Sequence, residues 1–235
     1  MNIFKDTMSE MTYEQIEKSV EQEAIVLFPV GIIEEHGPHL PLGTDIYLAY
    51  QQAHDVWEEL NDMEMPCVIA PPFYLGGVQA LTRHFPGTFA FSKGTIMACI
   101  EEYLENLDRF GFKNVVFFND HDDGLHISAI VEAIKNANCK LELQAYWMEY
   151  EYELKEHGFS GEEDYILKLT DMPFEEMFQI SKKLRDAFDI HAGAFETETM
   201  REIYQYIETN LKEADRRIAM DIANSLGKQV NGNYE

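Results

Sequence analysis

The chain has 235 residues, of which 43 are acidic and 18 basic, so its formal net charge is -25. A surface of this sign repels phosphate backbones, and we therefore expect no nucleic-acid partner. Hydrophobic residues make up 46% of the chain, enough for one large core, and we expect a single domain over 1–235. No apolar run approaches the roughly 20 residues of a membrane span, and no signal pattern opens the sequence, so a cytoplasmic protein without membrane contact is expected.

Hydrophobic periodicity predicts helices that alternate with short strands along most of the chain. The first helix, Met11–Gln22, has Thr12 and Gln15 in capping-box spacing. The elements expected after it are strand Ala24–Val30, helix Ile46–Leu60, strand Pro66–Ala70, helix Lys93–Phe110 ended by Gly111, strand Asn114–Phe118, helix Leu125–Asn136 and strand Leu141–Trp147. Further on, loop and short helix are expected over 149–174, helix over 177–188, loop over 191–196 and mostly helix over 198–222.

Strands that alternate with helices are typical of βαβ units. The expected fold is therefore α/β, with a mostly parallel central sheet covered by helices on both faces. Ligands of such sheets bind beyond the carboxyl ends of the strands. Polar residues that directly follow the buried strands are therefore the first candidates for a functional site.

One such group follows the strand Ala24–Val30 within the segment E-E-H-G-P-H-L-P-L-G-T-D, which runs from Glu34 to Asp45. Carboxylates and imidazoles on a loop rich in Gly and Pro are suitable ligands for a divalent metal ion. We expect Glu34, His36 and Asp45 to be such ligands. His39 could serve as a ligand too, but the Pro beside it favours a role in stabilising the loop.

A second group follows the strand Asn114–Phe118, where His121 and Asp123 repeat the spacing of Glu34 and His36. The two groups together would suffice for two metal ions bridged by one carboxylate. Such a centre holds a bridging hydroxide as nucleophile and polarises a substrate carbonyl. Taken alone, Asp123 could equally be the N-cap of the helix that follows it.

A third polar loop contains His191 and Glu196. An imidazole beside a metal centre could pass a proton to a leaving nitrogen, so His191 is a candidate catalytic residue. Glu196 could orient His191 or bind a metal ion itself.

These motifs together resemble the creatininase family of metal-dependent amidohydrolases. The resemblance covers P-V-G-x-x-E-x-H-G-P-H-L-P-L-x-T-D at 29–45, F-P-G-T at 85–88, G-F-x-x-x-x-x-x-N-x-H at 111–121 and H-A-G-x-x-E-T at 191–197. It implies a three-layer α/β/α sandwich and a binuclear centre of Zn²⁺ or Mn²⁺, with Fe²⁺ as a third candidate. It also implies hydrolysis of a C–N bond in a small amide, lactam or formamide by a homo-oligomer, often a hexamer.

The resemblance places the family's ligands on Glu34, His36, Asp45 and His121, with Asp45 as the bridge between the metals. Creatininase-like members have a Glu as fifth ligand two positions after the histidine, where this chain has Asp123. Either Asp123 or Glu196 would complete the second metal site. The family's histidine of proton transfer falls on His191.

The resemblance leaves the substrate open. Creatinine is not favoured, because creatininases carry an aromatic residue just after the metal-binding histidine and this chain has Asp122 there. Two alternatives to an amidohydrolase remain. One is a metal-binding member without catalytic activity, and the other is a hydrolase that opens a carbocyclic ketone.

Overall fold

The computed structural model describes residues 2–169 and 191–203. Their contacts divide them into two compact units. The sheet unit consists of Asn2–Glu34 and residues 45–169, and the loop–helix unit consists of Glu35–Thr44 and residues 191–203. The single domain over 1–235 stays a prediction. The expected helix 177–188 and the expected helical segment beyond residue 203 lie outside the described residues.

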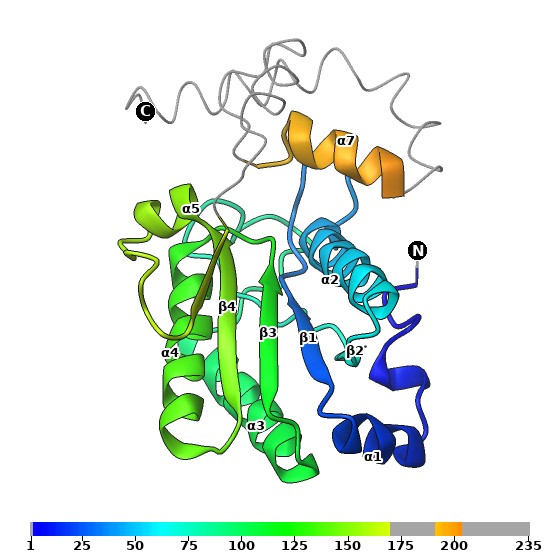
Figure 1. Ribbon diagram of the computed structural model, residues 1–235. Coiled ribbons are helices and arrows are strands. Elements are labelled where there is room, and N and C mark those ends of the chain that lie inside the picture. Colours follow the sequence, from blue (N-terminus) through cyan, green and yellow to red (C-terminus); the bar gives the residue numbers. More distant parts are fainter. Residues whose placement is uncertain (1, 170–190, 204–235) are drawn as a thin grey trace, which may run out of the picture. The chain divides into compact units, whose positions relative to one another are not determined.

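The sheet unit is built on five strands in the order β2-β1-β3-β4-β5, and every pair of neighbours is parallel (Figure 1). The strands are β1 (Ile25–Val30), β2 (Cys67–Ile69), β3 (Asn114–Asn119), β4 (Gln144–Tyr150) and β5 (Ile166–Leu169). In the central register Val26 of β1 is level with Val68 of β2 and Val115 of β3. The expected parallel α/β sheet is therefore confirmed.

Helices connect the strands and cover both faces of the sheet. The helices of the described residues are the 3-10 turn η1 (Met8–Glu10), α1 (Tyr13–Glu21), α2 (Thr44–Asp62), α3 (Lys93–Phe110), α4 (Gly124–Lys140), α5 (Glu151–Glu156) and α7 (Ala194–Ile203). The capping box predicted for α1 is present, and α3 has the predicted bounds.

Alternation along β1 separates the two hydrophobic cores. Phe28 and its neighbours on one face pack in a cluster with residues of α3 and α4, such as Ile100 and Ile130. Leu27 faces the other way and packs with Ala53 of α2. Figure 1 shows α2 in front of the strands and α3 and α4 behind them. The sheet unit is therefore a three-layer α/β/α arrangement, as expected.

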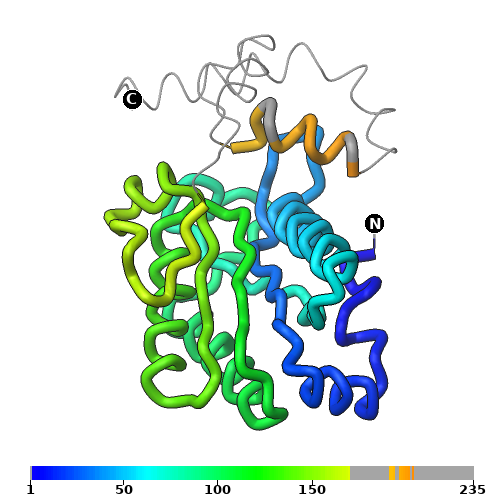
Figure 2. Tube along the Cα trace, viewed as in Figure 1, coloured from blue at the N-terminus to red at the C-terminus, as the bar shows by residue number. Residues whose placement is uncertain are grey.

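The strand β5 was missed by the sequence reasoning, which expected loop and short helix over 149–174. After β4 the chain forms the short helix α5 and then returns as β5 beside β4 (Figure 2). Only four residues pair, with Trp147 level with Ile166. A strand this short gives almost no periodic signal, and pairing with the edge of the existing sheet creates it. The predicted loop 191–196 was also too long, because α7 begins at Ala194.

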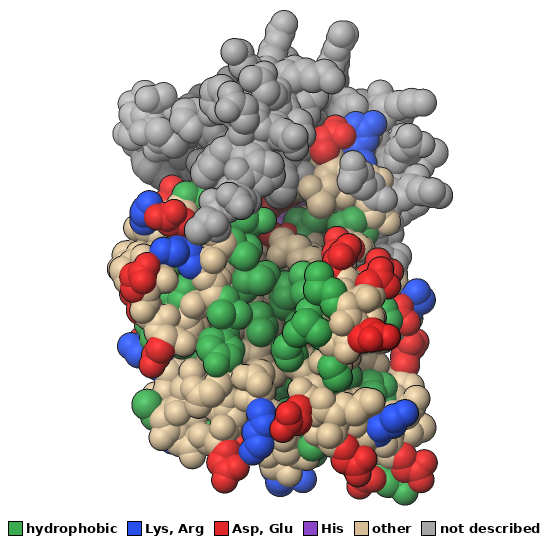
Figure 3. Space-filling model, viewed as in Figure 1, with side chains coloured by type: hydrophobic (Ala, Val, Ile, Leu, Met, Phe, Trp, Pro, Cys, Tyr) green, Lys and Arg blue, Asp and Glu red, His purple; other side chains and the backbone are tan. Residues whose placement is uncertain are grey.

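The α2 side of the sheet carries hydrophobic side chains at the molecular surface (Figure 3). Val116 and Met148 are only partly buried there, and Leu167 of β5 is 40% exposed. None of the helices in the described part of the chain is long and apolar enough to cross a membrane. All three cysteines, Cys67, Cys99 and Cys139, are free thiols.

Candidate metal centre

Three predicted ligands meet in the sheet unit at the carboxyl ends of its strands. Glu34 follows β1, His121 follows β3, and Asp45 lies in the first turn of α2. The Nδ1 atom of His121 lies 3.0 Å from Oε1 of Glu34 and 3.1 Å from Oδ2 of Asp45. All three side chains are buried, and each offers one ligand atom within 4.8 Å of the others. Residues up to 87 positions apart in sequence therefore form one potential metal-binding group.

The close approach of α2 to the end of β1 depends on Gly31. A Cβ atom at this position would lie 3.1 Å from the backbone nitrogen of Ile46 and 3.2 Å from the carbonyl carbon of Asp45. Glycine therefore lets the first turn of α2 pack directly against the segment that leads to Glu34. The positive end of the helix dipole also favours a carboxylate at Asp45.

The ring of His121 is oriented by a backbone carbonyl. Its Nε2 atom lies 3.0 Å from the carbonyl oxygen of Gly77, which can only accept a hydrogen bond. Nε2 therefore carries a proton, and Nδ1 is the atom that faces the two carboxylates. This arrangement, an imidazole with one nitrogen bound to a carbonyl and the other toward the site, is the usual one for a metal-binding histidine.

The electrostatics of His121 require a cation at Nδ1. Burial alone lowers the pKa of His121, but Asp45 and Glu34 outweigh this effect and raise the pKa well above its ordinary value of 6.5. Two carboxylate oxygens beside an imidazole lone pair repel one another unless a proton or a metal ion lies among them. The donor set of one nitrogen and two oxygens therefore fits a divalent metal ion.

Thr82 supports Glu34 and was missed by the sequence reasoning. Its buried hydroxyl donates a hydrogen bond to Oε2 of Glu34, while Oε1 of the same carboxylate faces His121. The segment that carries Thr82 is tied to the chain after β1, because the N–H of Phe89 donates to the carbonyl of Ile33. Thr82 therefore fixes the rotation of the Glu34 carboxylate.

We expect Thr82→Val to weaken metal binding by about 10- to 100-fold, the usual effect of losing a residue that orients a metal ligand. Valine keeps the shape of threonine but cannot donate to Glu34. The measurement is the Kd for Mn²⁺ by isothermal titration calorimetry. Thr82→Ser keeps the hydroxyl and should retain most of the affinity. Equal affinities of Thr82→Val and the unsubstituted protein would contradict this role.

Both carboxylate oxygens of Asp123 accept hydrogen bonds from backbone N–H groups. It is the N-cap of α4: Oδ1 accepts from the N–H of Leu125, and Oδ2 accepts from the N–H of Gln79. Among the described residues, no group of potential metal ligands includes Asp123. The geometry thus favours the N-cap role that the sequence had left open.

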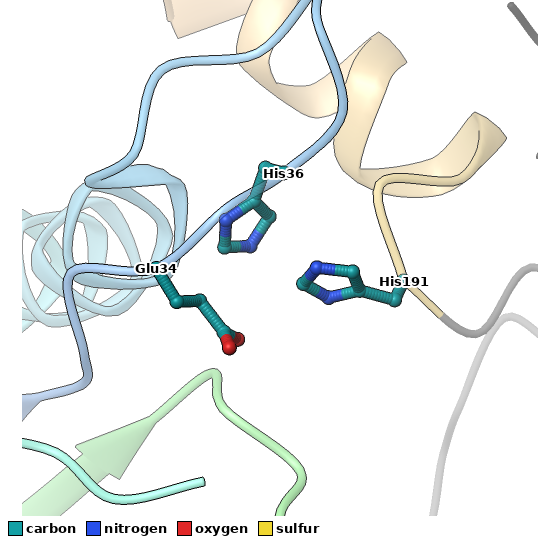
Figure 4. Close-up of side chains that lie close together, drawn as sticks. All are labelled: Glu34, His36 and His191. Atoms are coloured by element: carbon teal, nitrogen blue, oxygen red, sulfur yellow. The ribbon is translucent and has the colours of Figure 1, made fainter. Parts of the chain in front are cut away.

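The loop–helix unit brings together the remaining predicted residues. The rings of His36 and His191 lie next to each other, with their centroids 4.4 Å apart (Figure 4). Glu196, in the first turn of α7, offers a carboxylate oxygen within 4.8 Å of a ring nitrogen of His36. Nε2 of His191 lies 2.6 Å from the carbonyl oxygen of Glu35, so this nitrogen carries a proton.

His39 and Glu35 have local contacts within the loop–helix unit. Nε2 of His39 lies 3.0 Å from the hydroxyl of Thr197, which ties the loop to α7. The carboxylate of Glu35 accepts a hydrogen bond from the N–H of Gly37. The first contact agrees with the expected loop-stabilising role of His39.

A second buried acidic group lies where β4 ends. Glu149, the penultimate residue of β4, is 6% exposed and accepts a hydrogen bond from the N–H of Tyr150. Burial and the neighbouring carboxyl group of Glu153 raise the pKa of Glu149 to about 11. Nearby, Asp122 forms an ion pair with His157. Glu149 is therefore protonated in the folded protein at neutral pH.

The parallel sheet and the His–carboxylate group at its strand ends define an α/β protein with a candidate metal centre. A family model for creatinine amidohydrolase, named Creatininase, matches residues 9–223. The chain belongs to the creatininase family.

Individual relatives of the chain differ in what they act on. A mycofactocin precursor peptide peptidase from Mycolicibacterium smegmatis is 34% identical over 113 residues, which are 47% of this chain and 43% of that protein. A creatinine amidohydrolase from Pseudomonas putida is 25% identical over 207 residues, 84% of this chain and 71% of the relative. The match thus spans less than half of the mycobacterial peptidase.

Solved structures confirm the fold. A crystal structure of creatinine amidohydrolase superposes with a TM-score of 0.62 at 23% identity, covering 86% of this chain and 73% of that one. A structure named "Creatininase Mn" gives the same TM-score and identity, with 86% and 74% covered.

Proposed function

We propose that this protein is a metal-dependent hydrolase of a C–N bond in a small amide, lactam or formamide. The observation that carries the proposal is the group of Glu34, Asp45 and His121, whose ligand atoms converge on one point in the sheet unit. Divalent metal ions held there would lower the pKa of a coordinated water molecule and polarise the carbonyl to be attacked.

We propose that His36 and Glu196 hold the second metal ion, with Asp45 as the bridging carboxylate. Part of the support is that these residues are close along the chain. One residue separates Glu34 from His36, and Asp45 follows the same loop. A carboxylate oxygen of Glu196 lies within 4.8 Å of a ring nitrogen of His36, which supports Glu196 as the fifth metal ligand. Asp123 is the weaker candidate for this position, because both of its carboxylate oxygens accept backbone N–H groups.

His191 is proposed as the group that protonates the leaving nitrogen. Its Nε2–H donates to the carbonyl of Glu35, which fixes the direction of the ring, and an imidazole is a common general acid. The ring lies beside His36 and is therefore close to the proposed ligand set. The proposal further includes a homo-oligomer, a hexamer in the family pattern, that acts on a small molecule in the cytoplasm.

The test is the metal content per chain, measured by mass spectrometry on protein purified without a His-tag, followed by assays with amides, lactams and formamides. We expect about two Zn²⁺ or Mn²⁺ ions per chain and turnover of at least one substrate class, lost with a chelator and restored by the metal. Glu196→Gln should lose one ion and Asp123→Ala none.

Other results would redirect the proposal. If Asp123→Ala bound one ion and Glu196→Gln still bound two, Asp123 rather than Glu196 would be the fifth metal ligand. A chain that takes up no divalent metal would contradict the proposed function. Two bound ions with turnover of a cyclic diketone and of no amide would point to the carbocyclic alternative.

A further inference from the structure

His126 is a fully buried histidine of α4 that the proposed function does not use. Its Nε2 atom lies 3.1 Å from Oδ1 of Asn119, the last residue of β3. Its ring also meets the ring of His121 edge to face, with centroids 5.0 Å apart and an interplanar angle of 64°. His126 therefore contacts both the candidate metal ligand and the residue that precedes its loop.

The hydrogen bonds around Asn119 fix the direction of each donor. Nδ2 of Asn119 donates to the carbonyl oxygen of His121 at 3.0 Å, so the amide nitrogen points toward the loop. Oδ1 accepts from the N–H of His121 at 3.4 Å and faces His126 on its other side. Since Oδ1 can only accept, Nε2 of His126 must carry the proton, and the side-chain amide of Asn119 holds both backbone groups of His121.

The environment of the second ring nitrogen of His126, Nδ1, indicates a functional rather than a purely structural role. Nδ1 is buried and has no hydrogen-bond partner in the part of the chain that the structure describes. A buried unpaired acceptor costs free energy that an apolar side chain of similar size would not, and such costs are typical of functional positions.

We propose that His126 is a positioning residue for metal binding, acting through Asn119 on the backbone of His121. The ring of His121 is held from one side by the carbonyl of Gly77, and its backbone is held from the other by Asn119. His126 prevents rotation of the Asn119 amide and packs against the imidazole. Nδ1 of His121 is thereby kept in place toward Glu34 and Asp45 before any metal ion arrives. This inference rests on the proposed metal site.

The test compares the Kd for Mn²⁺ with the thermal unfolding temperature in the same variants. His126→Phe keeps an aromatic ring against His121 and removes the donor to Asn119. We expect it to weaken Mn²⁺ binding by about 10- to 100-fold while the unfolding temperature stays the same or rises. His126→Gln retains an N–H donor and should recover part of the affinity.

A second pair of variants tests the same path through Asn119. Asn119→Ala should weaken Mn²⁺ binding to a similar extent, and the double variant with His126→Phe should add little, because both act through one path. Asn138→Ala is the matched control, since Asn138 clamps the backbone of Ala145 in the same way, with bonds of 2.7 and 2.9 Å. It should lower stability without changing the Kd.

The possible results separate this inference from the proposed function. Unchanged affinity in His126→Phe, or an equal loss in Asn138→Ala, would overturn the positioning role while leaving the metal site intact. Affinity that also survives Asp45→Asn would instead show that the Mn²⁺ site lies elsewhere, and both proposals would fail. Strong weakening in His126→Phe with partial recovery in His126→Gln would support the positioning role.

Discussion

Replacement of Asp45 by Asn is expected to remove metal ions and hydrolysis together. Asp45 is the proposed bridge, and its Oδ2 atom lies 3.1 Å from Nδ1 of His121 in the sheet unit. An amide has one carbonyl oxygen and no charge, so it cannot neutralise two metal ions. Loss of about 4 kcal/mol of transition-state stabilisation corresponds to roughly a thousandfold fall in kcat/KM, and we expect at least this much.

The measurement combines metal content per chain with turnover of whichever amide the assays identify. Asp62→Asn is a suitable control, because Asp62 ends the same helix and is exposed. Its metal content and activity should match those of the unsubstituted protein. An Asp45→Asn variant that retained two metal ions and full turnover would remove Asp45 from the centre and end the binuclear interpretation.

Replacement of Glu149 by Gln is expected to stabilise the fold, and more so as the pH rises. The buried carboxyl group has a pKa of about 11 because of burial and of the nearby Glu153. In the unfolded chain it ionises near its ordinary pKa of 4.5. Above that pH the folded state holds a proton that the unfolded state has lost, so stability falls as the pH rises. The glutamine side chain does not ionise, so its contribution to stability does not depend on pH. Its carbonyl oxygen can still accept a hydrogen bond from the N–H of Tyr150.

The measurement is the free energy of unfolding in urea at pH 5 and at pH 8. The advantage of Glu149→Gln should grow between these values by at most about 1.4 kcal/mol per pH unit. Glu105→Gln, an exposed change on α3, should give the same difference from the parent protein at both pH values. A Glu149→Gln advantage that is constant or shrinks with pH would show that Glu149 is ionised in the folded protein.

The sequence predicted those parts of the site that follow strongly periodic strands. β1 and β3 are apolar runs, so their ends could be located, and with them Glu34 and His121. Because β1 and β3 run parallel, their carboxyl ends, and with them the two residues, lie at one edge of the sheet. The alternation of strands and helices along the chain was enough to predict this parallel arrangement. Asp45 was predicted from the same loop, although it lies in the first turn of a helix.

The residues that support the ligands could not be predicted in the same way. Thr82 lies in a segment without periodicity and reaches Glu34 across 48 positions. His126 sits on a helical face that reads as core, and its contact with Asn119 depends on how α4 packs on β3. Asp123 matched both a ligand and an N-cap, and its hydrogen bonds from the N–H groups of Leu125 and Gln79 favour the N-cap. Such contacts arise from tertiary packing, which local patterns do not encode.

The bond that orients His121 has an evolutionary consequence, because its acceptor is the carbonyl of Gly77 rather than a side chain. No codon change can delete a main-chain oxygen. Glycine also suits position 77, because a Cβ atom there would lie 3.0 Å from the backbone carbonyl oxygen of Phe91. The tautomer of the imidazole is thus inherited with the backbone. Substitution of the side chains around the site therefore leaves this hydrogen-bond acceptor in place.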